Sequence, residues 1–117
     1  IFFHKFEQTG DLGNLQKAIE HTEEALAATP QDHPYRAARH NNLGSIFSSR
    51  FERIGDLGDL KKAIEHAEEA LAATPRDHPH TATIHNNLGF FLSTRFKRIG
   101  DPGDLQKAID HAQEALT

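Results

Sequence analysis

Apolar residues recur every three or four positions through the middle of the chain, which is the spacing of one face of a helix. Charged residues fill the positions between them over residues 61–69. One apolar stripe on an otherwise polar segment is typical of an amphipathic α-helix with one buried side. Strict alternation, the mark of a half-buried strand, does not occur. The stripe is formed by Leu57, Leu60, Ile64, Ala67 and Leu71.

Gly, Asp and Pro mark where the helices begin and end. Gly-Asp pairs at 10–11, 55–56 and 100–101 suit the end of one helix and the N-cap of the next. Pro102 supports this, because Pro is favoured at the first helical position. The residues before Pro30 and Pro75 are pushed out of the helical region. We therefore predict helices over 12–28, 57–73 and 102–116, and partner helices over 35–53 and 80–98.

The whole pattern repeats every 45 residues. Residues 6–35 and 51–80 are identical at 23 of 30 positions, and the sequence that begins at His40 recurs in similar form from His85. A fixed period of this length predicts a solenoid, in which each helical hairpin buries its apolar face against its neighbours. We predict one all-α array of antiparallel helix hairpins with about 2.6 repeats. Its units are a partial repeat at 1–34 and repeats at 35–79 and 80–117, and the chain starts midway through a helix that matches residues 46–54.

The motifs of these hairpins resemble the tetratricopeptide repeat. The first helix of the pair reads His40-x2-Leu43-Gly44-x2-Phe47, and the second reads Ala63-x3-Ala67-x2-Ala70-x4-Pro75. The resemblance implies a right-handed superhelix that serves protein–protein interaction. The unit is longer than the family's 34 residues, and a bulky aromatic of the second helix is replaced by small residues. The long unit resembles repeats of the kinesin-light-chain type and arrays in fungal and bacterial signalling proteins.

Small residues at matching positions predict close helix packing. Gly44 and Gly89 lie in mid-helix, where Gly costs up to about 1 kcal/mol against Ala. A helix carries that cost where another backbone must pass close by, and Ala63 and Ala70 are the facing small residues.

Polar residues on the first helix of each repeat form the candidate site. In the family that this chain resembles, this helix lines a concave groove, and an Asn just before Leu-Gly contacts a bound peptide; that position maps to Asn42 and Asn87. A carboxamide both donates and accepts, so it can pair with any peptide unit. The alternative is that these Asn residues bond to neighbouring helices. Phe90 is either an apolar anchor for a partner or a packed ring. The predicted peptide-binding residues are Asn41, Asn42, Ser45, Ser48, Asn86, Asn87, Phe90 and Lys97.

Charge is sorted between the two kinds of helix. Residues 35–54 and 80–99 each carry a net charge of +3, whereas residues 56–74 carry −3. If the basic helices face inward, the groove would favour an acidic peptide. The alternative is that the opposite charges help adjacent helices to pack.

Several classes of function have no support in the sequence. The chain has no Cys and no Gly-rich phosphate loop, and no catalytic constellation stands out, so we expect neither an enzyme nor a cofactor. The nine histidines follow the repeat, and equivalent positions would lie about 10 Å apart, so we expect no metal site. The net charge of −4 argues against nucleic acid, and no apolar run approaches a membrane span. We expect a cytoplasmic protein.

The two ends predict self-association. Phe2, Phe3 and Phe6 crowd the first segment, and Ala112 and Leu116 have no following repeat to cover them. We expect a fragment of a longer array that stacks end to end or exchanges a helix with a second copy. Two functions remain open: a module that presents a concave, Asn-lined groove to a peptide or protein segment, or a structural, self-associating arm of a larger signalling protein with no groove ligand.

Overall fold

The computed structural model of the protein describes residues 12–116, and this part of the chain contains helices and no strand. The predicted segment at the start of the chain, with its three Phe residues, lies outside the described residues. Every helix begins and ends within one residue of its prediction, and none of those described is long and apolar enough to cross a membrane. The five helices are α2 (Leu12–Ala27), α3 (Tyr35–Ile54), α4 (Leu57–Ala72), α5 (Thr81–Ile99) and α6 (Pro102–Ala115).

The Gly-Asp pairs at 55–56 and 100–101 end one helix and begin the next, as predicted, whereas the pair at 10–11 lies outside the described residues. Gly55 and Gly100 have φ angles of 81° and 85°, in the left-handed region that Gly enters most readily. The Asp56 carboxylate accepts a hydrogen bond from the backbone N–H of Gly58 at 2.8 Å, which caps α4. Asp101 caps α6 in the same way at 2.9 Å. The helix limits are therefore set by local chemistry that the sequence already contains.

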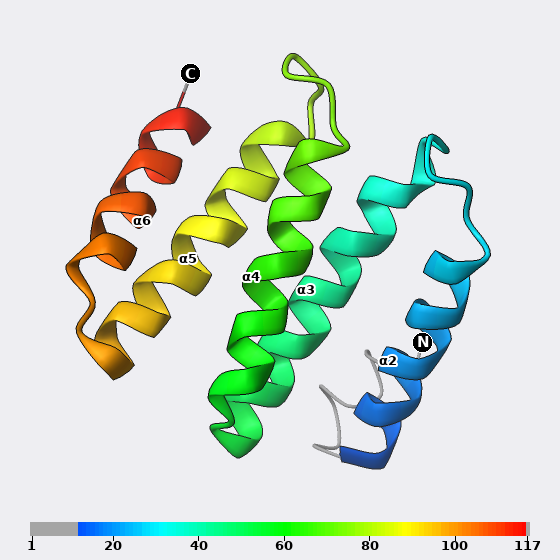
Figure 1. Cartoon of the computed structure of the whole chain (residues 1–117), viewed down its shortest axis with the longest axis horizontal. Coiled ribbons are helices and arrows are strands. Elements are labelled where there is room, and N and C mark those ends of the chain that lie inside the picture. Colours follow the sequence, from blue (N-terminus) through cyan, green and yellow to red (C-terminus); the bar gives the residue numbers. More distant parts are fainter. Residues whose placement is uncertain (1–11, 117) are drawn as a thin grey trace.

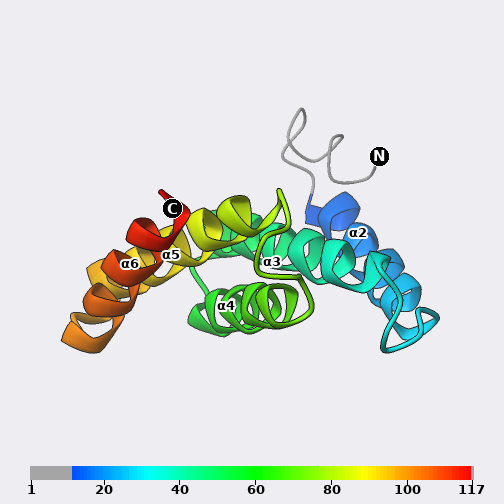
Figure 2. The same ribbon diagram turned by 90° about the horizontal axis from the view of Figure 1, so that it is seen from above.

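The helices lie side by side in chain order and alternate in direction (Figure 1). Seen from above, α4 lies on one side of the array, whereas α3 and α5 lie on the other (Figure 2). The molecule is 21 Å thick along its shortest axis, which is about two helix diameters. Helix α3 packs against α4 and α2, α5 packs against α6 and α4, and α3 also touches α5. This packing is consistent with a helical repeat.

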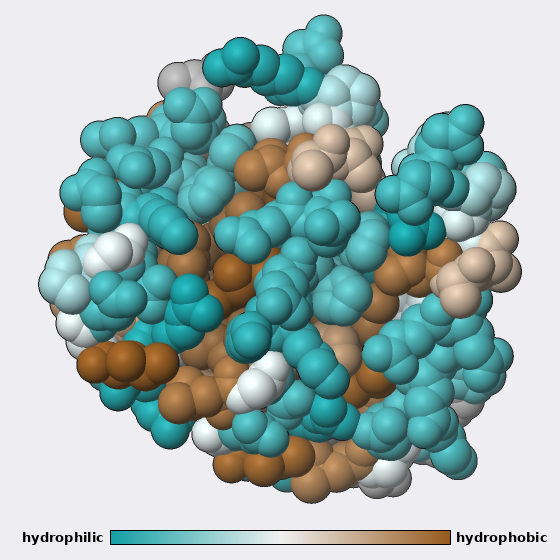
Figure 3. All heavy atoms as spheres, viewed as in Figure 1, coloured by the Kyte–Doolittle hydropathy of each residue, from teal (hydrophilic) through white to brown (hydrophobic). Residues whose placement is uncertain are grey.

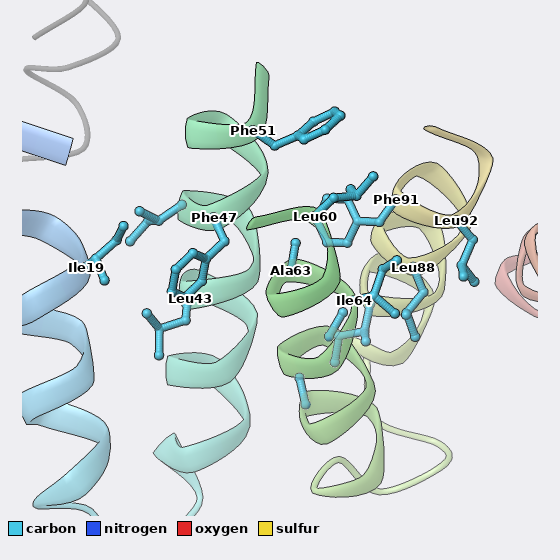
Figure 4. Packing of buried hydrophobic residues seen from close by; sticks show 14 of the residues in the cluster. Ile19, Leu43, Phe47, Phe51, Leu60, Ala63, Ile64, Leu88, Phe91 and Leu92 are labelled. Atoms are coloured by element: carbon cyan, nitrogen blue, oxygen red, sulfur yellow. The ribbon is translucent and has the colours of Figure 1, made fainter. Parts of the chain in front are cut away.

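The buried apolar residues form one continuous cluster that joins the hairpins (Figure 4). The cluster includes Leu43 and Phe47 of α3, Leu60 of α4, and Leu88 and Leu92 of α5, and each of these side chains is at most 1% exposed. Burying one such side chain contributes roughly 1.5–3 kcal/mol. The cluster therefore holds consecutive repeats together as well as each hairpin.

The same apolar stripe has different surroundings in α4 and in α6. Leu60 and Ile64 are 0% and 4% exposed, because α5 packs on that side of α4. Their counterparts one repeat later, Leu105 and Ile109, are 38% and 43% exposed. In the view of Figure 3 the edge where α6 lies is mostly hydrophilic, with small hydrophobic patches between the polar residues. We call this stripe, together with Leu116, the α6 end face.

Candidate interaction face

The polar residues predicted as a binding site lie along the seam between α3 and α5. These two helices run in the same direction (Figure 1) and touch each other. One hydrogen bond crosses the seam, from the Nδ2 of Asn87 to the Oδ1 of Asn41 at 3.0 Å. Because a helix turns about 100° per residue, the neighbours Asn42 and Asn86 project on the same side of this pair. Both are exposed.

The four Asn residues therefore divide into two kinds. Asn41 and Asn87 are half-buried and bonded to each other, which is the interhelical alternative that the sequence left open. Asn42 and Asn86 are exposed on the surface above them. The pair members keep unused carboxamide atoms, because each Asn has two donor hydrogens and an acceptor oxygen. Of these four Asn residues, only Asn42 and Asn86 are exposed.

Helix α5 also carries an exposed aromatic ring, Phe90. Phe90 is 56% exposed, and its ring stands edge-on to Phe91 with centroids 6.1 Å apart. Ser45, which occupies the equivalent position in α3, is half-buried. Ser93 and Lys97 continue the same ridge along α5 by helical spacing. We call the surface formed by Asn42, Ser45, Asn86, Phe90 and Lys97 the α3–α5 face.

Ser48 requires a correction. The sequence placed it on the inner face, but it is buried, with 6% of its surface exposed. Helical spacing from Asn41 turns Ser48 toward α5, so the neighbouring helix covers it. Its counterpart Ser93 is half-buried, and no described helix follows α5 on that side. A single helical wheel does not show this difference, which depends on the neighbour.

The basic residues of α3 and α5 are largely engaged within the fold. Arg50 makes two hydrogen bonds to the Asp59 carboxylate, at 3.1 and 2.9 Å, and Arg95 makes the same pair to Asp104 at 2.9 and 3.0 Å. The hydrogen bond from Arg95 holds the pKa of Asp104 below its usual value. Both carboxylates are buried at the start of a second helix. These ion pairs thus join the two helices of each hairpin, which is the alternative in which opposite charges help adjacent helices to pack.

Lys97 and Arg98 remain exposed at the end of α5. The guanidinium carbon of Arg98 lies 5.3 Å from the centroid of the Phe51 ring, which is a cation–π contact across the seam. The positive charge that is open to a partner is therefore smaller than the net +3 of the helix.

Gly44 and Ala63 meet as the sequence predicted. A Cβ added to Gly44 would lie 3.1 Å from the carbonyl oxygen of Ala63, so the backbones of α3 and α4 pass close together there. At Gly89 the equivalent contact, to the oxygen of Ala108, is looser at 3.4 Å. Ala63 and Ala70 are both fully buried.

Two histidine pairs were not anticipated. The Nδ1 atoms of His40 and His66 lie 2.9 Å apart, and those of His85 and His111 lie 2.8 Å apart. The sequence argument compared equivalent histidines in successive repeats, whereas these pairs join α3 to α4 and α5 to α6. The signal was present as a spacing of 26 residues that occurs twice, but only the hairpin brings the rings together.

The pairs have consequences for protonation but do not form a metal site by themselves. In each pair one Nδ1 donates and the other accepts. Burial, followed by the positive charge of the partner ring, lowers the pKa of His40 and of His111. Burial also lowers the pKa of His66. No group of three or more potential metal ligands occurs among residues 12–116.

Comparison of the chain with protein-family models and with curated proteins found no match. The resemblance of its motifs to the tetratricopeptide repeat therefore rests on the residues quoted above.

Proposed function

We propose that the protein is a non-catalytic interaction module of the tetratricopeptide type, whose α3–α5 face binds a peptide or protein segment. The observation that carries the proposal is Phe90, an aromatic side chain with 56% of its surface exposed, in the place where the previous repeat has Ser45. The core does not require a ring at this position, because the equivalent hairpin packs without one. Exposed aromatics in a polar rim are typical anchors of protein interfaces.

The surroundings of Phe90 suit a peptide ligand. Asn42 and Asn86 are exposed, and each offers a donor and an acceptor to a peptide backbone. Lys97 adds a positive charge to the ridge, which favours a segment with an acidic residue next to an apolar one. The proposed occupant is therefore an extended segment that places an apolar side chain on Phe90 and an acidic side chain near Lys97.

The test uses the substitution that the chain itself provides. Phe90→Ser restores the residue of the previous repeat and removes the anchor, so the fold is expected to stay intact by circular dichroism. Affinity for segments selected from a peptide library should fall by about tenfold or more. Glu65→Gln is the control, because Glu65 is an exposed residue of α4 that lies outside the α3–α5 face. A selected segment that binds wild type and Phe90→Ser equally well would refute the assignment.

A second function is favoured by the α6 end face. Leu105 and Ile109 are exposed although Leu60 and Ile64, one repeat earlier, are buried beneath α5. We propose that this stripe binds a helix with the pattern of α5, supplied by a second copy of the chain. Each fully buried Leu or Ile would contribute roughly 1.5–3 kcal/mol. The protein would then be a self-associating structural arm.

Light scattering across a concentration series tests this second function. The apparent mass should rise with concentration for wild type and stay at the monomer value for Ile109→Glu. Glu65→Gln is the control, because Glu65 is an exposed polar residue of α4. A wild-type monomer at every concentration up to about 1 mM, equivalent to an association of less than about 4 kcal/mol, would remove the self-association proposal and leave the α3–α5 face as the remaining candidate.

A further inference from the structure

The two connectors between hairpins fold alike. In both, the residue before Pro bonds back into the preceding helix: the hydroxyls of Thr29 and Thr74 donate to the carbonyls of Ala25 and Ala70, each at 2.6 Å. The turn that follows closes with a hydrogen bond of 3.0 Å from the N–H of His33 or His78 to the carbonyl oxygen of the Pro three residues before it. The connectors therefore present the same backbone groups at the same places.

The side chains at one pair of equivalent positions, Arg36 and Thr81, make different hydrogen bonds to these backbone groups. In the first connector, Nη1 of Arg36 donates to the carbonyl oxygens of Leu26 and Thr29, at 3.2 and 3.0 Å. Leu26 lies in the last turn of α2 and Thr29 lies two residues beyond its end, where the helix dipole is negative. The Leu26 oxygen also accepts a hydrogen bond from the N–H of Thr29 at 3.1 Å. The position equivalent to Arg36 in the second connector is Thr81. Its hydroxyl donates to the carbonyl of Pro75 at 2.9 Å, and it brings no charge.

A cleft of about 550 Å³ lies at this second connector, between the end of α4, the start of α5 and the end of α6. The space-filling view shows a hollow at the same edge (Figure 3). Of its eleven lining residues, nine are identical to their counterparts one repeat earlier; the exceptions are Thr81 for Arg36 and Arg76 for Gln31.

The cleft has the chemistry of a site for a long cationic side chain. Leu71, Pro79 and Ala115 give it apolar walls that suit a methylene stem. Asp77 and Glu114 line it with negative charge, and Thr74 lies at the end of α4. His85 also lines the cleft, and Arg76 is a like charge at its exposed rim.

We propose that this cleft binds the guanidinium of an arginine side chain from a partner protein segment, in the position that Arg36 occupies in the first connector. The guanidinium donates to the carbonyls of Leu71 and Thr74, as Arg36 donates to those of Leu26 and Thr29. Its planar donors can serve two oxygens at once, which the ammonium of Lys does less well. The site goes beyond the α3–α5 face, since Thr81 lies about 13 Å along α5 from Phe90.

The experiment titrates a blocked pentapeptide, Gly-Ser-Arg-Ser-Gly, into the ¹⁵N-labelled protein. The expected result is saturable movement of the amide signals of Thr74, Thr81 and Ala115. The same peptide with Lys in the centre should bind several-fold more weakly. Equal affinity for the two peptides would overturn the assignment to a guanidinium, and equal affinity for free arginine would overturn the assignment to a protein segment. No saturable movement with any ligand would overturn the site.

Two reciprocal variants use the internal template. Thr81→Arg supplies the side chain that fills the first connector, so peptide binding should fall by at least about tenfold. Arg36→Thr opens the first connector, so a second set of signals around Thr29 should move and the stoichiometry should rise from one to two. Thr81→Ser keeps the hydroxyl and should bind as wild type does. Arg76→Gln removes the like charge and should strengthen binding. Unchanged binding in Thr81→Arg would refute the proposal.

Discussion

The close approach at Gly44 predicts that one substitution has opposite effects in two repeats. Gly44→Ala and Gly89→Ala replace the same residue at equivalent places in α3 and α5. In mid-helix, Ala is favoured over Gly by about 0.8–1.0 kcal/mol, so both variants gain this amount. The two positions differ in what the new methyl group meets.

At Gly44 the methyl group would lie 3.1 Å from the Ala63 carbonyl oxygen and 3.7 Å from Cε2 of Phe91. The first contact is to helix backbone inside the core, so α3 and α4 must separate by a few tenths of an ångström. Overpacking of a core costs about 1–3 kcal/mol. Set against the helical gain, Gly44→Ala should lower the free energy of unfolding by about 0–2 kcal/mol.

At Gly89 the nearest contact is 3.4 Å, an ordinary van der Waals distance, and the partly exposed α6 can give way. Gly89→Ala should therefore raise the free energy of unfolding by about 0.5–1 kcal/mol. Urea unfolding at one fixed protein concentration measures both variants, with an unchanged m-value as the condition for comparing midpoints. If Gly44→Ala proves at least as stable as Gly89→Ala, the distances do not govern packing and the reasoning fails.

Three further predictions follow from the contacts between helices. Because burial lowers the pKa of His40, His66 and His111, the unfolded chain binds more protons than the folded one just below the ordinary value of 6.5. The free energy of unfolding should therefore be highest above that pH and fall as the pH drops through it. His66→Gln should make the free energy of unfolding, measured with urea at pH values from 8 to 5.5, depend less on pH. Asp104→Asn should lower the free energy of unfolding by about 1–3 kcal/mol, because it leaves the half-buried Arg95 without its carboxylate; the exposed Asp110→Asn is the control, and equal midpoints would contradict this. Asn87→Ala should lower the free energy of unfolding by about 0.5–1.5 kcal/mol, because it removes the hydrogen bond to Asn41. The exposed Asn86→Ala should stay within about 0.5 kcal/mol of wild type in thermal unfolding. If Asn86→Ala is the less stable of the two, the hydrogen bond between α3 and α5 does not stabilise the fold.

The helices and their limits could be predicted from the sequence alone, for a local reason. The apolar stripe of each segment, the Gly-Asp pairs and the Pro residues act within a few positions of themselves. Asp56 caps its own helix, and Gly55 needs only its own backbone freedom. The arrangement of the hairpins could be predicted from the repeat, because identical sequences make the same local contacts. The close approach at Gly44 could also be predicted from the sequence, because a helix-destabilising Gly recurs at the equivalent position, Gly89, of the next repeat.

The tertiary structure alone decided what each polar residue contacts. Asn41 and Asn86 occupy equivalent positions, yet Asn41 is bonded to Asn87 of α5 and Asn86 is exposed. The reason is that α5 packs beside Asn41, whereas none of the described helices occupies the equivalent place beside Asn86. The same dependence on a neighbour buries Ser48 and opens Leu105. The histidine pairs, and the cleft beside Thr81 at the position equivalent to Arg36, arise only when helices meet. A repeated sequence fixes the local conformation of its units, whereas the environment of each copy depends on its place in the array.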